Sequence, residues 1–243
     1  MDEPRVHLRI ASELRFFLPP RHRGGELNVR LDGTSSLGHL VESVGVPLPE
    51  AGTLTVGGKL VPPSYRPERG DRVVVDPVQR PQPLPAARFL LDVHLGTLAR
   101  RLRLVGVDTD YSNDRDDDEL IERANAARRV LLTQDRGLLR RRKLWLGAYV
   151  RGARPDDQLA DVLDRFAPAL APWTRCLVCN GPLAPARKRD VERYLQPGTR
   201  RTYQEFARCL ACGGVYWRGA HSRRLAAIVD SATRAVARSG GCG

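Results

Sequence analysis

Two short cysteine pairs near the C-terminal end constrain the fold of this chain more than any other feature. They are Cys176-Leu-Val-Cys179 and Cys209-Leu-Ala-Cys212, separated by residues 180–208. Two such pairs can form two tight turns that place four sulfurs tetrahedrally around Zn²⁺. A site closed by four sulfur ligands is structural, because it leaves no position for a substrate. We therefore predict a structural zinc ribbon over residues 168–222.

The positive charge of the chain, +12 in total, is concentrated in the same region. Residues 1–78 hold ten basic and ten acidic side chains, residues 79–167 hold 17 and 14, and residues 168–243 hold 13 and four. This asymmetry favours a polyanion, and nucleic acid first, as the partner of the C-terminal two thirds. A genome that encodes Arg often is the alternative explanation, but it accounts for the preference for Arg over Lys and not for the asymmetry.

The chain shows no signal for a membrane or for secretion. No apolar run approaches the roughly 20 residues that span a bilayer. The N-terminus carries Asp2 and Glu3 in place of the basic start and apolar stretch of a signal peptide. We therefore expect a cytoplasmic protein with no membrane partner, in which disulfides are the weaker alternative to zinc at the four cysteines.

Residues 1–78 show the element order of a β-grasp, or ubiquitin-like, domain. The pattern predicts two strands, a helix capped by Thr34 or Ser35, and three further strands, over residues 5–10, 27–31, 37–44, 54–56, 60–61 and 72–75. Val56-Gly57-Gly58-Lys59 and Gly70-Asp71-Arg72-Val73 resemble the small sulfur carriers of this fold. Those carriers use a free C-terminal Gly-Gly, whereas Gly57-Gly58 is predicted to form a hairpin turn. We therefore interpret the domain as a scaffold or a partner-binding module.

A proline-rich stretch, residues 79–87, separates this domain from the next. Pro81, Pro83 and Pro85 favour an extended, stiff linker. Over residues 88–167 strands and helices alternate, which predicts a parallel sheet with helices on both faces. Ligands of such sheets bind beyond the carboxyl ends of the strands.

Acidic residues occur where these strands end. Asp92 directly follows the predicted strand Phe89-Leu90-Leu91, and Asp135 comes three residues after Leu132. Two further groups open helices, namely Asp116-Asp117-Asp118-Glu119 and Asp156-Asp157. Carboxylates that lie close together need a cation between them, and hard oxygen ligands suit Mg²⁺ or Mn²⁺. Such an ion can activate water to hydrolyse a phosphodiester.

Each acid also has a structural interpretation. Asp117 and Asp156 are equally well explained as helix caps or first-turn charges. Asp114 and Asp116 resemble charges of a solvated loop, and Asp135 can be a turn residue. Asp92 is harder to explain in this way, because an acid at the end of an apolar strand costs stability unless it is paired or bound.

Several runs follow one another in a distinctive order. They are Phe89-Leu90-Leu91-Asp92, Gly96-Thr97-Leu98-Ala99-Arg100-Arg101-Leu102-Arg103, Gly106-Val107-Asp108-Thr109, Asp117-Asp118-Glu119-Leu120, Leu131-Leu132-Thr133-Gln134-Asp135-Arg136, Asp157-Gln158-Leu159, Tyr216-Trp217 and Gly219-Ala220-His221. In this order they resemble the RNase domain family named for the C-terminal part of the mutator-seven exonuclease. That family is PIN-like, is inferred to be an RNase and ends in a zinc ribbon, and several bacterial members carry a ubiquitin-like domain in front.

The resemblance implies an acidic, metal-binding catalytic site at Asp92, Asp117 and Asp135, with Mg²⁺ or Mn²⁺ as the ion. Asp157 is a weaker fourth candidate, and Asp118 can replace Asp117 because the run of acids leaves the register ambiguous. Candidate RNA-binding residues are those that can hold a phosphate or stack on an unpaired base, and they are Arg100, Arg136, Arg187, Lys188, Arg189, Tyr216, Trp217 and His221. Tyr216 and Trp217 can equally pack the small ribbon, and a lone His is more often structural than catalytic.

The predicted architecture is an α/β chain in five segments: a β-grasp domain (1–78), a linker (79–87), a PIN-like RNase domain (88–167), a zinc ribbon (168–222) and a C-terminal helix or tail (223–243). The predicted function is metal-dependent hydrolysis of RNA, with the ribbon aiding RNA binding. One alternative is a non-catalytic adaptor that binds RNA or the ribosome. Another is a toxin-like regulator whose β-grasp domain recruits a protein partner.

Overall fold

The chain divides into two compact units that do not follow the order of the sequence. A computed structural model describes residues 3–219 and 222–240. Unit 1 comprises residues 1–79 and 135–149, and unit 2 comprises residues 80–134 and 150–243. Within the described ranges, no helix combines the length and the apolar composition that a membrane crossing requires.

The N-terminal part of unit 1 is a five-stranded sheet packed on a short helix. The strands follow the order β2-β1-β5-β3-β4, in which β1 is parallel to β5 and antiparallel to β2. Their bounds are β1 (Arg5–Ile10), β2 (Glu26–Arg30), β3 (Ala51–Val56), β4 (Lys59–Leu60) and β5 (Arg72–Pro77). Alternate residues of β1, namely Val6, Leu8 and Ile10, are buried in the core. This topology confirms the predicted ubiquitin-like domain.

Two local predictions in this domain have different outcomes. Gly57 and Gly58 form the turn between β3 and β4, with φ angles of +55° and +82°, so the hairpin turn is confirmed. The cap of helix α1 (Leu37–Ser43) is Ser36 and not Thr34 or Ser35. The carboxylate of Asp32 accepts hydrogen bonds from the backbone N–H groups of both Thr34 and Ser35, so the helix begins beyond these two residues. Short 3-10 helices cover Ser12–Phe17, Pro20–His22 and Leu48–Glu50.

Residues 135–149 complete unit 1 and contain helix α4 (Arg136–Leu139) and strand β9 (Gly147–Tyr149). The Arg136 guanidinium donates hydrogen bonds to the carbonyl oxygens of Phe17 (2.9 Å) and Phe16 (3.2 Å), and it lies 5.1 Å from the centroid of the Phe17 ring. These contacts give Arg136 a structural role in unit 1. Its predicted role in RNA binding stays a prediction.

Strand β9 is attached to the same domain through its last residue. The backbone N–H of Tyr149 donates to a carboxylate oxygen of the buried Glu50 at 2.8 Å, and the Tyr149 ring meets the Phe17 ring edge-on at 5.1 Å. The region predicted as one RNase domain, residues 88–167, is thus divided between the two units. A prediction from local periodicity cannot include these contacts, because they join residues that are far apart in the sequence.

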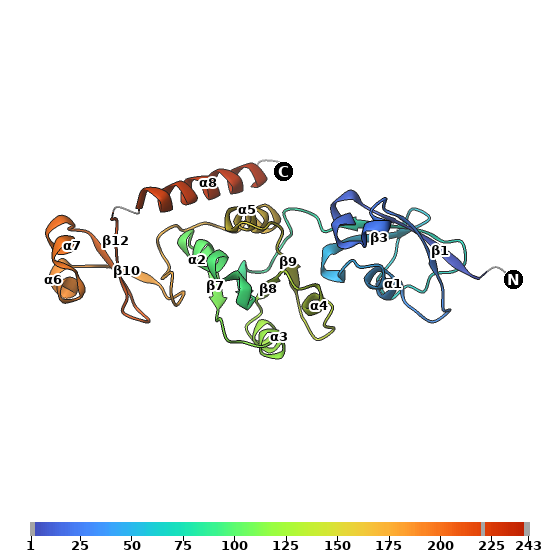
Figure 1. Ribbon diagram of the computed structural model, residues 1–243, viewed down its shortest axis with the longest axis horizontal. Coiled ribbons are helices and arrows are strands. Elements are labelled where there is room, and N and C mark those ends of the chain that lie inside the picture. Colours follow the sequence, from blue (N-terminus) through green and yellow to red (C-terminus); the bar gives the residue numbers. More distant parts are fainter. Residues whose placement is uncertain (1–2, 220–221, 241–243) are drawn as a thin grey trace. The chain divides into compact units, whose positions relative to one another are not determined.

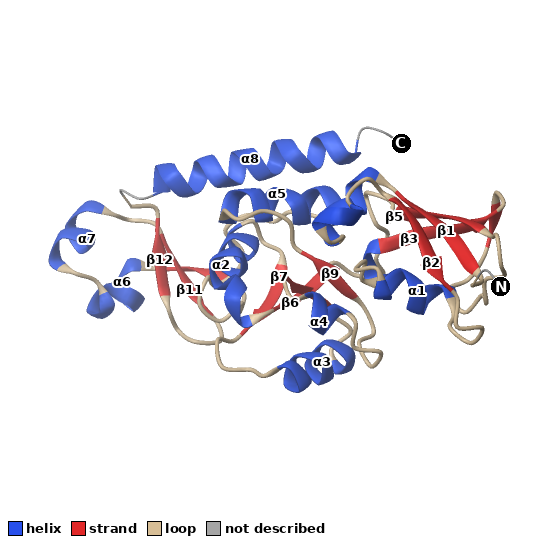
Figure 2. Ribbon diagram, turned by 45° about the vertical axis from the view of Figure 1, so that its right-hand side comes forward, coloured by secondary structure: helices blue, strands red, loops and turns tan. Residues whose placement is uncertain are grey.

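Unit 2 contains the parallel strands of the predicted RNase domain. Strand β6 (Arg88–Leu91) lies between β7 (Asp108–Tyr111) and β8 (Val130–Thr133) and is parallel to both. Helices α2 (Gly96–Leu104) and α5 (Pro155–Phe166) lie on one side of these strands, and α3 (Asp117–Ala126) lies on the other in both views (Figures 1 and 2). A 3-10 turn, Val93–Leu95, precedes α2. The alternation of strands and helices and the parallel sheet are confirmed.

The proline-rich stretch is bound to α5 within unit 2. The Arg80 guanidinium forms ion pairs of 2.8 Å with Asp161 and with Asp164 of that helix. The backbone N–H of Gln82 donates to the carbonyl oxygen of Arg165, whose guanidinium donates in turn to the Gln82 side chain. The proline-rich stretch therefore packs against α5 of unit 2, and it also connects the ubiquitin-like domain to β6.

Gly106, which follows α2, is expected to tolerate no side chain. Its φ angle is +86°, and a Cβ atom there would lie 1.9 Å from the carbonyl oxygen of Ala171. We expect Gly106→Ala to lower the free energy of unfolding by at least about 2 kcal/mol, because both the backbone conformation and the contact oppose a side chain. Chemical denaturation measures this change. Gly198→Ala is the matched control, since a Cβ there meets nothing within 4 Å, and an equal effect of both substitutions would contradict the prediction.

The C-terminal part of unit 2 is a small antiparallel sheet followed by a long helix. Strands β10 (Leu183–Ala186), β11 (Phe206–Cys209) and β12 (Val215–Trp217) pair in that order. Helices α6 (Lys188–Val191) and α7 (Pro197–Thr202), with a 3-10 turn at Glu192–Tyr194 between them, connect β10 to β11. The hydrophobic cluster beside this sheet is small: it consists of the buried Val191, Leu195 and Phe206, with Ala186, Tyr203 and Val215 partly buried against them. Helix α8 (Ser222–Gly240) runs beside α5 (Figures 1 and 2).

Candidate metal centre and acidic site

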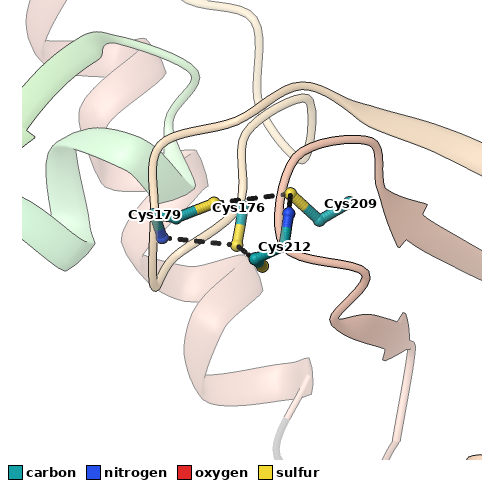
Figure 3. Close-up of side chains that lie close together, drawn as sticks. All are labelled: Cys176, Cys179, Cys209 and Cys212. Carbon is teal, nitrogen blue, oxygen red and sulfur yellow. Dashed lines mark hydrogen bonds between the residues drawn. The ribbon is translucent and has the colours of Figure 1, made fainter.

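The four predicted cysteines lie together in one cluster (Figure 3). The sulfur atoms of Cys176 and Cys212 are 3.7 Å apart and those of Cys179 and Cys209 are 3.5 Å apart. These distances exclude disulfides, whose sulfurs lie about 2.05 Å apart. Four sulfurs at about 2.3 Å from a tetrahedral ion lie about 3.8 Å from one another. The cluster therefore has the dimensions of a four-thiolate metal site and is compatible with a zinc ribbon.

Both cysteine pairs form the same local turn. The backbone N–H of the second cysteine in each pair points to the sulfur of the first, at 3.5 Å for both Cys179 and Cys212. Asn180 and Gly213, the residues that follow, have φ angles of +67° and +74°. A Cβ atom at Gly181 would lie only 3.0 Å from the sulfur of Cys209. Asn and Gly at these positions thus allow the chain to turn tightly enough to bring the two pairs together.

The surroundings of the cluster favour a thiolate. Burial raises the pKa of Cys176, but hydrogen bonds from the Tyr216 hydroxyl, at 2.9 Å, and from the backbone N–H groups of Cys179 and Val178 outweigh it and lower that pKa to about 6. Burial and the neighbouring thiols raise the pKa of Cys179. A divalent cation that prefers sulfur can bind such a cluster, because it binds the thiolate and displaces the protons of the other thiols.

The first cysteine pair is fixed to the RNase part of unit 2 by Arg103. This residue of α2 is 3% exposed, and its guanidinium donates to the carbonyl oxygens of Thr109 (2.9 Å), Leu177 (3.1 Å) and Val178 (2.8 Å). One side chain therefore joins α2, β7 and the loop between Cys176 and Cys179. Arg103 was not singled out from the sequence, where it is one of three arginines of α2 and lies in the last turn of that helix.

Asn180 makes a second connection between the same parts. Its side-chain oxygen accepts from the backbone N–H of Thr109 at 3.1 Å, and its amide nitrogen donates to the carboxylate of Asp108 at 2.8 Å. The ribbon is therefore held to the N-terminal end of β7.

Arg103→Met is expected to lower the free energy of unfolding of unit 2 by about 2–4 kcal/mol, because three carbonyl oxygens lose their donor in a buried place. Hydrogen exchange is expected to rise first in residues 176–180. Thermal denaturation and exchange mass spectrometry measure the two effects. Arg100→Met, an exposed change on the same helix, is the control, and equal losses for both variants would contradict the role assigned to Arg103.

Asp92 occupies the carboxyl end of β6. It is 7% exposed, and its carboxylate accepts a hydrogen bond of 2.5 Å from the hydroxyl of Thr133, the last residue of β8. Its backbone N–H donates to the carbonyl oxygen of Leu132, which continues the pairing of the two strands. The Tyr111 hydroxyl donates to the carbonyl oxygen of Val93 at 2.9 Å and holds the chain just after Asp92. The carboxyl group of Asp92 is thus buried and held in place at the end of β6.

The acidic run before α3 is organised around Asp116 and not around Asp117. The Asp116 carboxylate accepts from the backbone N–H of Glu119 at 2.9 Å, and the Glu119 carboxylate accepts from that of Asp116 at 3.2 Å. The interpretation of Asp116 as solvated loop charge is therefore wrong, because this residue is the helix cap. Asp117 and Asp118 are exposed in the first turn, after the loop that leaves the carboxyl end of β7.

The other two predicted acids have structural partners. Asp135 caps α4 in unit 1, where its carboxylate accepts from the backbone N–H groups of Gly137 (2.6 Å) and Leu138 (3.4 Å). Both oxygens of Asp157 accept from the Arg154 guanidinium, at 2.9 and 3.0 Å. The hydrogen bond from Arg154 lowers the pKa of Asp157. An ion at Asp157 would therefore have to displace Arg154.

The carboxylates do not form a closed set of ligands as the side chains stand. Of the residues described, only the four cysteines form a group of three or more His, Cys, Asp or Glu side chains whose ligand atoms all lie within 4.8 Å. The acidic site at Asp92, Asp117 and Asp135 therefore stays a prediction.

The predicted RNA-binding residues other than Arg136 have different surroundings. Arg100 and Trp217 are exposed. Arg187, Lys188 and Arg189 lie at the start of α6 with nearby polar partners, since Arg187 is 2.8 Å and Arg189 3.8 Å from Asp190, and Lys188 donates to Gln204. Tyr216 has its hydroxyl on Cys176, which favours the packing interpretation for this residue. His221 lies outside the described residues, as does Cys242.

The comparisons with known proteins agree with this architecture. The family profile described as the Mut7-C RNAse domain matches residues 87–229, and the profile described as Mut7-C ubiquitin matches residues 3–83. A search of curated proteins found no match, and a search of solved structures found none either. Since the RNase profile covers more than half of the chain, this protein belongs to the Mut7-C RNAse domain family and carries the Mut7-C ubiquitin domain in front.

Proposed function

We propose that this protein is a ribonuclease of PIN-like type that depends on Mg²⁺ or Mn²⁺. The observation that carries the proposal is the buried carboxylate of Asp92 at the carboxyl end of a parallel strand, in a chain of an RNase domain family. A buried acid lowers stability unless it has a function or a strong partner. The position after the strand is where parallel sheets bind their ligands.

The acids that follow these strands along the chain are of the kind that a hard divalent cation takes as ligands. Asp92 follows β6, Asp117 opens the helix after β7, and Gln134 alone separates Asp135 from β8 along the chain. We assign Asp92, Asp117 and Asp135 as the oxygen ligands of the ion. The bound ion would supply an activated water and offset charge on the phosphodiester. Asp157 is a less favoured ligand because of its pairing with Arg154.

Zinc is the ion that we propose for the four cysteines, in a purely structural role. The ribbon then presents basic residues to RNA, with Arg187, Lys188 and Arg189 at its surface. Arg100, which is exposed on α2 in the RNase part of unit 2, is proposed as a further basic residue that contacts RNA. The ubiquitin-like domain is proposed to bind a protein or ribosomal partner.

The test is cleavage of single-stranded and folded RNA by the purified full chain with Mg²⁺, with Mn²⁺ or with EDTA. We expect cleavage with a metal and none with EDTA, and zinc content is measured in each sample so that loss of the ribbon is not mistaken for loss of the catalytic ion. Tight RNA binding without cleavage under any metal would contradict the nuclease and favour an RNA-binding adaptor.

A further inference from the structure

A groove of about 600 Å³ within unit 2 is lined mostly by residues of the ribbon, together with Leu104 of α2 and Leu225 of α8. Its walls are mainly apolar and aromatic, and they include Leu104, Trp173, Phe206, Trp217 and Leu225. Trp217 is 41% exposed, which is unusual for a side chain whose burial would stabilise so small a domain. The four-cysteine site and the acidic edge do not explain why two indole rings line this surface.

We propose that this groove binds an unpaired base of single-stranded RNA by stacking it on the tryptophan rings. The proposal rests on the proposed function in one respect, since it names single-stranded RNA as the substrate class. It concerns binding and not cleavage, so the two can fail separately.

Trp173 is held at the groove by a strained backbone. Its φ angle is +65°, in the left-handed region that a bulky side chain rarely adopts. The backbone N–H of Trp173 donates to the carbonyl oxygen of Leu104 at 3.0 Å, and that of Ala171 donates to Val105 at 3.0 Å. These bonds to the end of α2 maintain the conformation. Strain of this kind occurs preferentially at binding and catalytic sites, where a side chain must be held in one place.

The polar groups around the groove suit a nucleotide better than an apolar peptide. Arg218 lies over the Trp173 ring, 5.7 Å from its centroid. A guanidinium stacked in this way keeps its N–H donors at its edge, where a phosphate can accept from them. Arg175 also lines the groove but already donates to the carbonyl oxygens of Gly106 and Asn180. Arg218 is therefore the residue assigned to the phosphate beside the bound base.

The charge of the surrounding region supports the same occupant. Residues 168–243 contain 13 basic and four acidic side chains, and Glu205 is the single acid among the residues that line the groove. An excess of basic side chains does not stabilise a bound apolar peptide, whereas it attracts the phosphates on either side of a stacked base. Aromatic rings with basic neighbours are the usual combination in proteins that bind single strands without a fixed sequence.

The test measures affinity with the full chain carrying Asp92→Asn, so that any cleavage is suppressed. The ligands are a labelled single-stranded oligoribonucleotide, the same strand with abasic sites, and the corresponding duplex. Trp217→Ala is expected to weaken binding of the intact strand about 5- to 100-fold and to leave the weak binding of the abasic strand unchanged. Trp217→Tyr is expected to retain most of the affinity. Trp145→Phe, which changes the exposed tryptophan of unit 1, is the matched control.

A fluorescence measurement needs no variant of the groove itself. With Trp145→Phe, the two remaining tryptophans, Trp173 and Trp217, both line the groove. Stacking of a base is expected to quench their emission with the intact strand and not with the abasic strand. Equal affinity for the intact and the abasic strand, or saturable quenching by a proline-rich peptide with none by RNA, would overturn the proposal. Because binding is the readout, a protein without nuclease activity can still support it.

Discussion

Asp92→Asn is expected to lower the rate of RNA cleavage by at least about 100-fold while the fold is retained. Changes to groups that merely support a metal ligand typically cost 10- to 100-fold, and loss of a charged ligand costs more. Asparagine has the shape of aspartate and can still accept the hydrogen bond from Thr133, so the strand ends remain joined. The loss should therefore appear in the chemical step and not in the melting temperature.

Single-turnover cleavage with Mn²⁺ at saturating protein measures this effect, with zinc content and circular dichroism as checks on the fold. Asp230→Asn is the matched control, because it removes one exposed carboxylate from α8, away from the sheet edge. Retained cleavage in Asp92→Asn would exclude this residue from the catalytic site. If both variants lose activity together, net charge and not the acidic site would be the cause.

Removal of the metal from the four-cysteine site is expected to unfold the ribbon. Its core consists of Val191, Leu195 and Phe206, which is too small to stabilise a domain by burial alone. Structural zinc in comparable small domains contributes an apparent binding free energy of about 10–16 kcal/mol near neutral pH, and this energy is also folding energy. Cys209→Ser is expected to have the same effect as a strong chelator.

The loss should extend beyond the ribbon. Arg103 and Asn180 join the first cysteine pair to β7, so unfolding of the ribbon removes partners from Thr109 and Asp108 as well. We therefore expect a lower transition temperature for the whole of unit 2, together with rapid hydrogen exchange over residues 175–218. Zinc analysis with scanning calorimetry measures this, and Cys242→Ser is the control. An unchanged transition in the metal-free protein would contradict a structural role.

The elements that could be predicted from the sequence are those whose cause is local. The spacing of Cys176, Cys179, Cys209 and Cys212 specifies two turns, and those turns bring the sulfurs together. The alternation in β1 and the apolar run Phe89-Leu90-Leu91 of β6 determine which faces are buried, because side chains of a strand alternate and those of a central parallel strand are covered on both sides. For the same reason the order of strands and helices along the chain was sufficient to predict the ubiquitin-like domain and the parallel sheet.

Only the tertiary structure decided how several polar residues are used. Asp116, Asp117 and Asp118 are interchangeable in a sequence pattern, and the hydrogen bond from Glu119 is what makes Asp116 the cap. Arg136 is a candidate RNA-binding residue in the sequence, yet its guanidinium is bound to carbonyl oxygens about 120 residues earlier in the chain. Such pairings depend on which distant groups the fold brings within hydrogen-bond distance.

The same reason explains the division of the chain and the groove of the ribbon. Residues 135–149 belong to unit 1 because Glu50, Phe16 and Phe17 bind them, and local periodicity contains no information about those partners. Trp173 and Trp217 lie far apart in the sequence, and only folding of the ribbon against α2 places both beside one groove. The sequence by itself thus determined the elements and the four-cysteine cluster, while the long-range packing of the chain decided which side chains remain exposed.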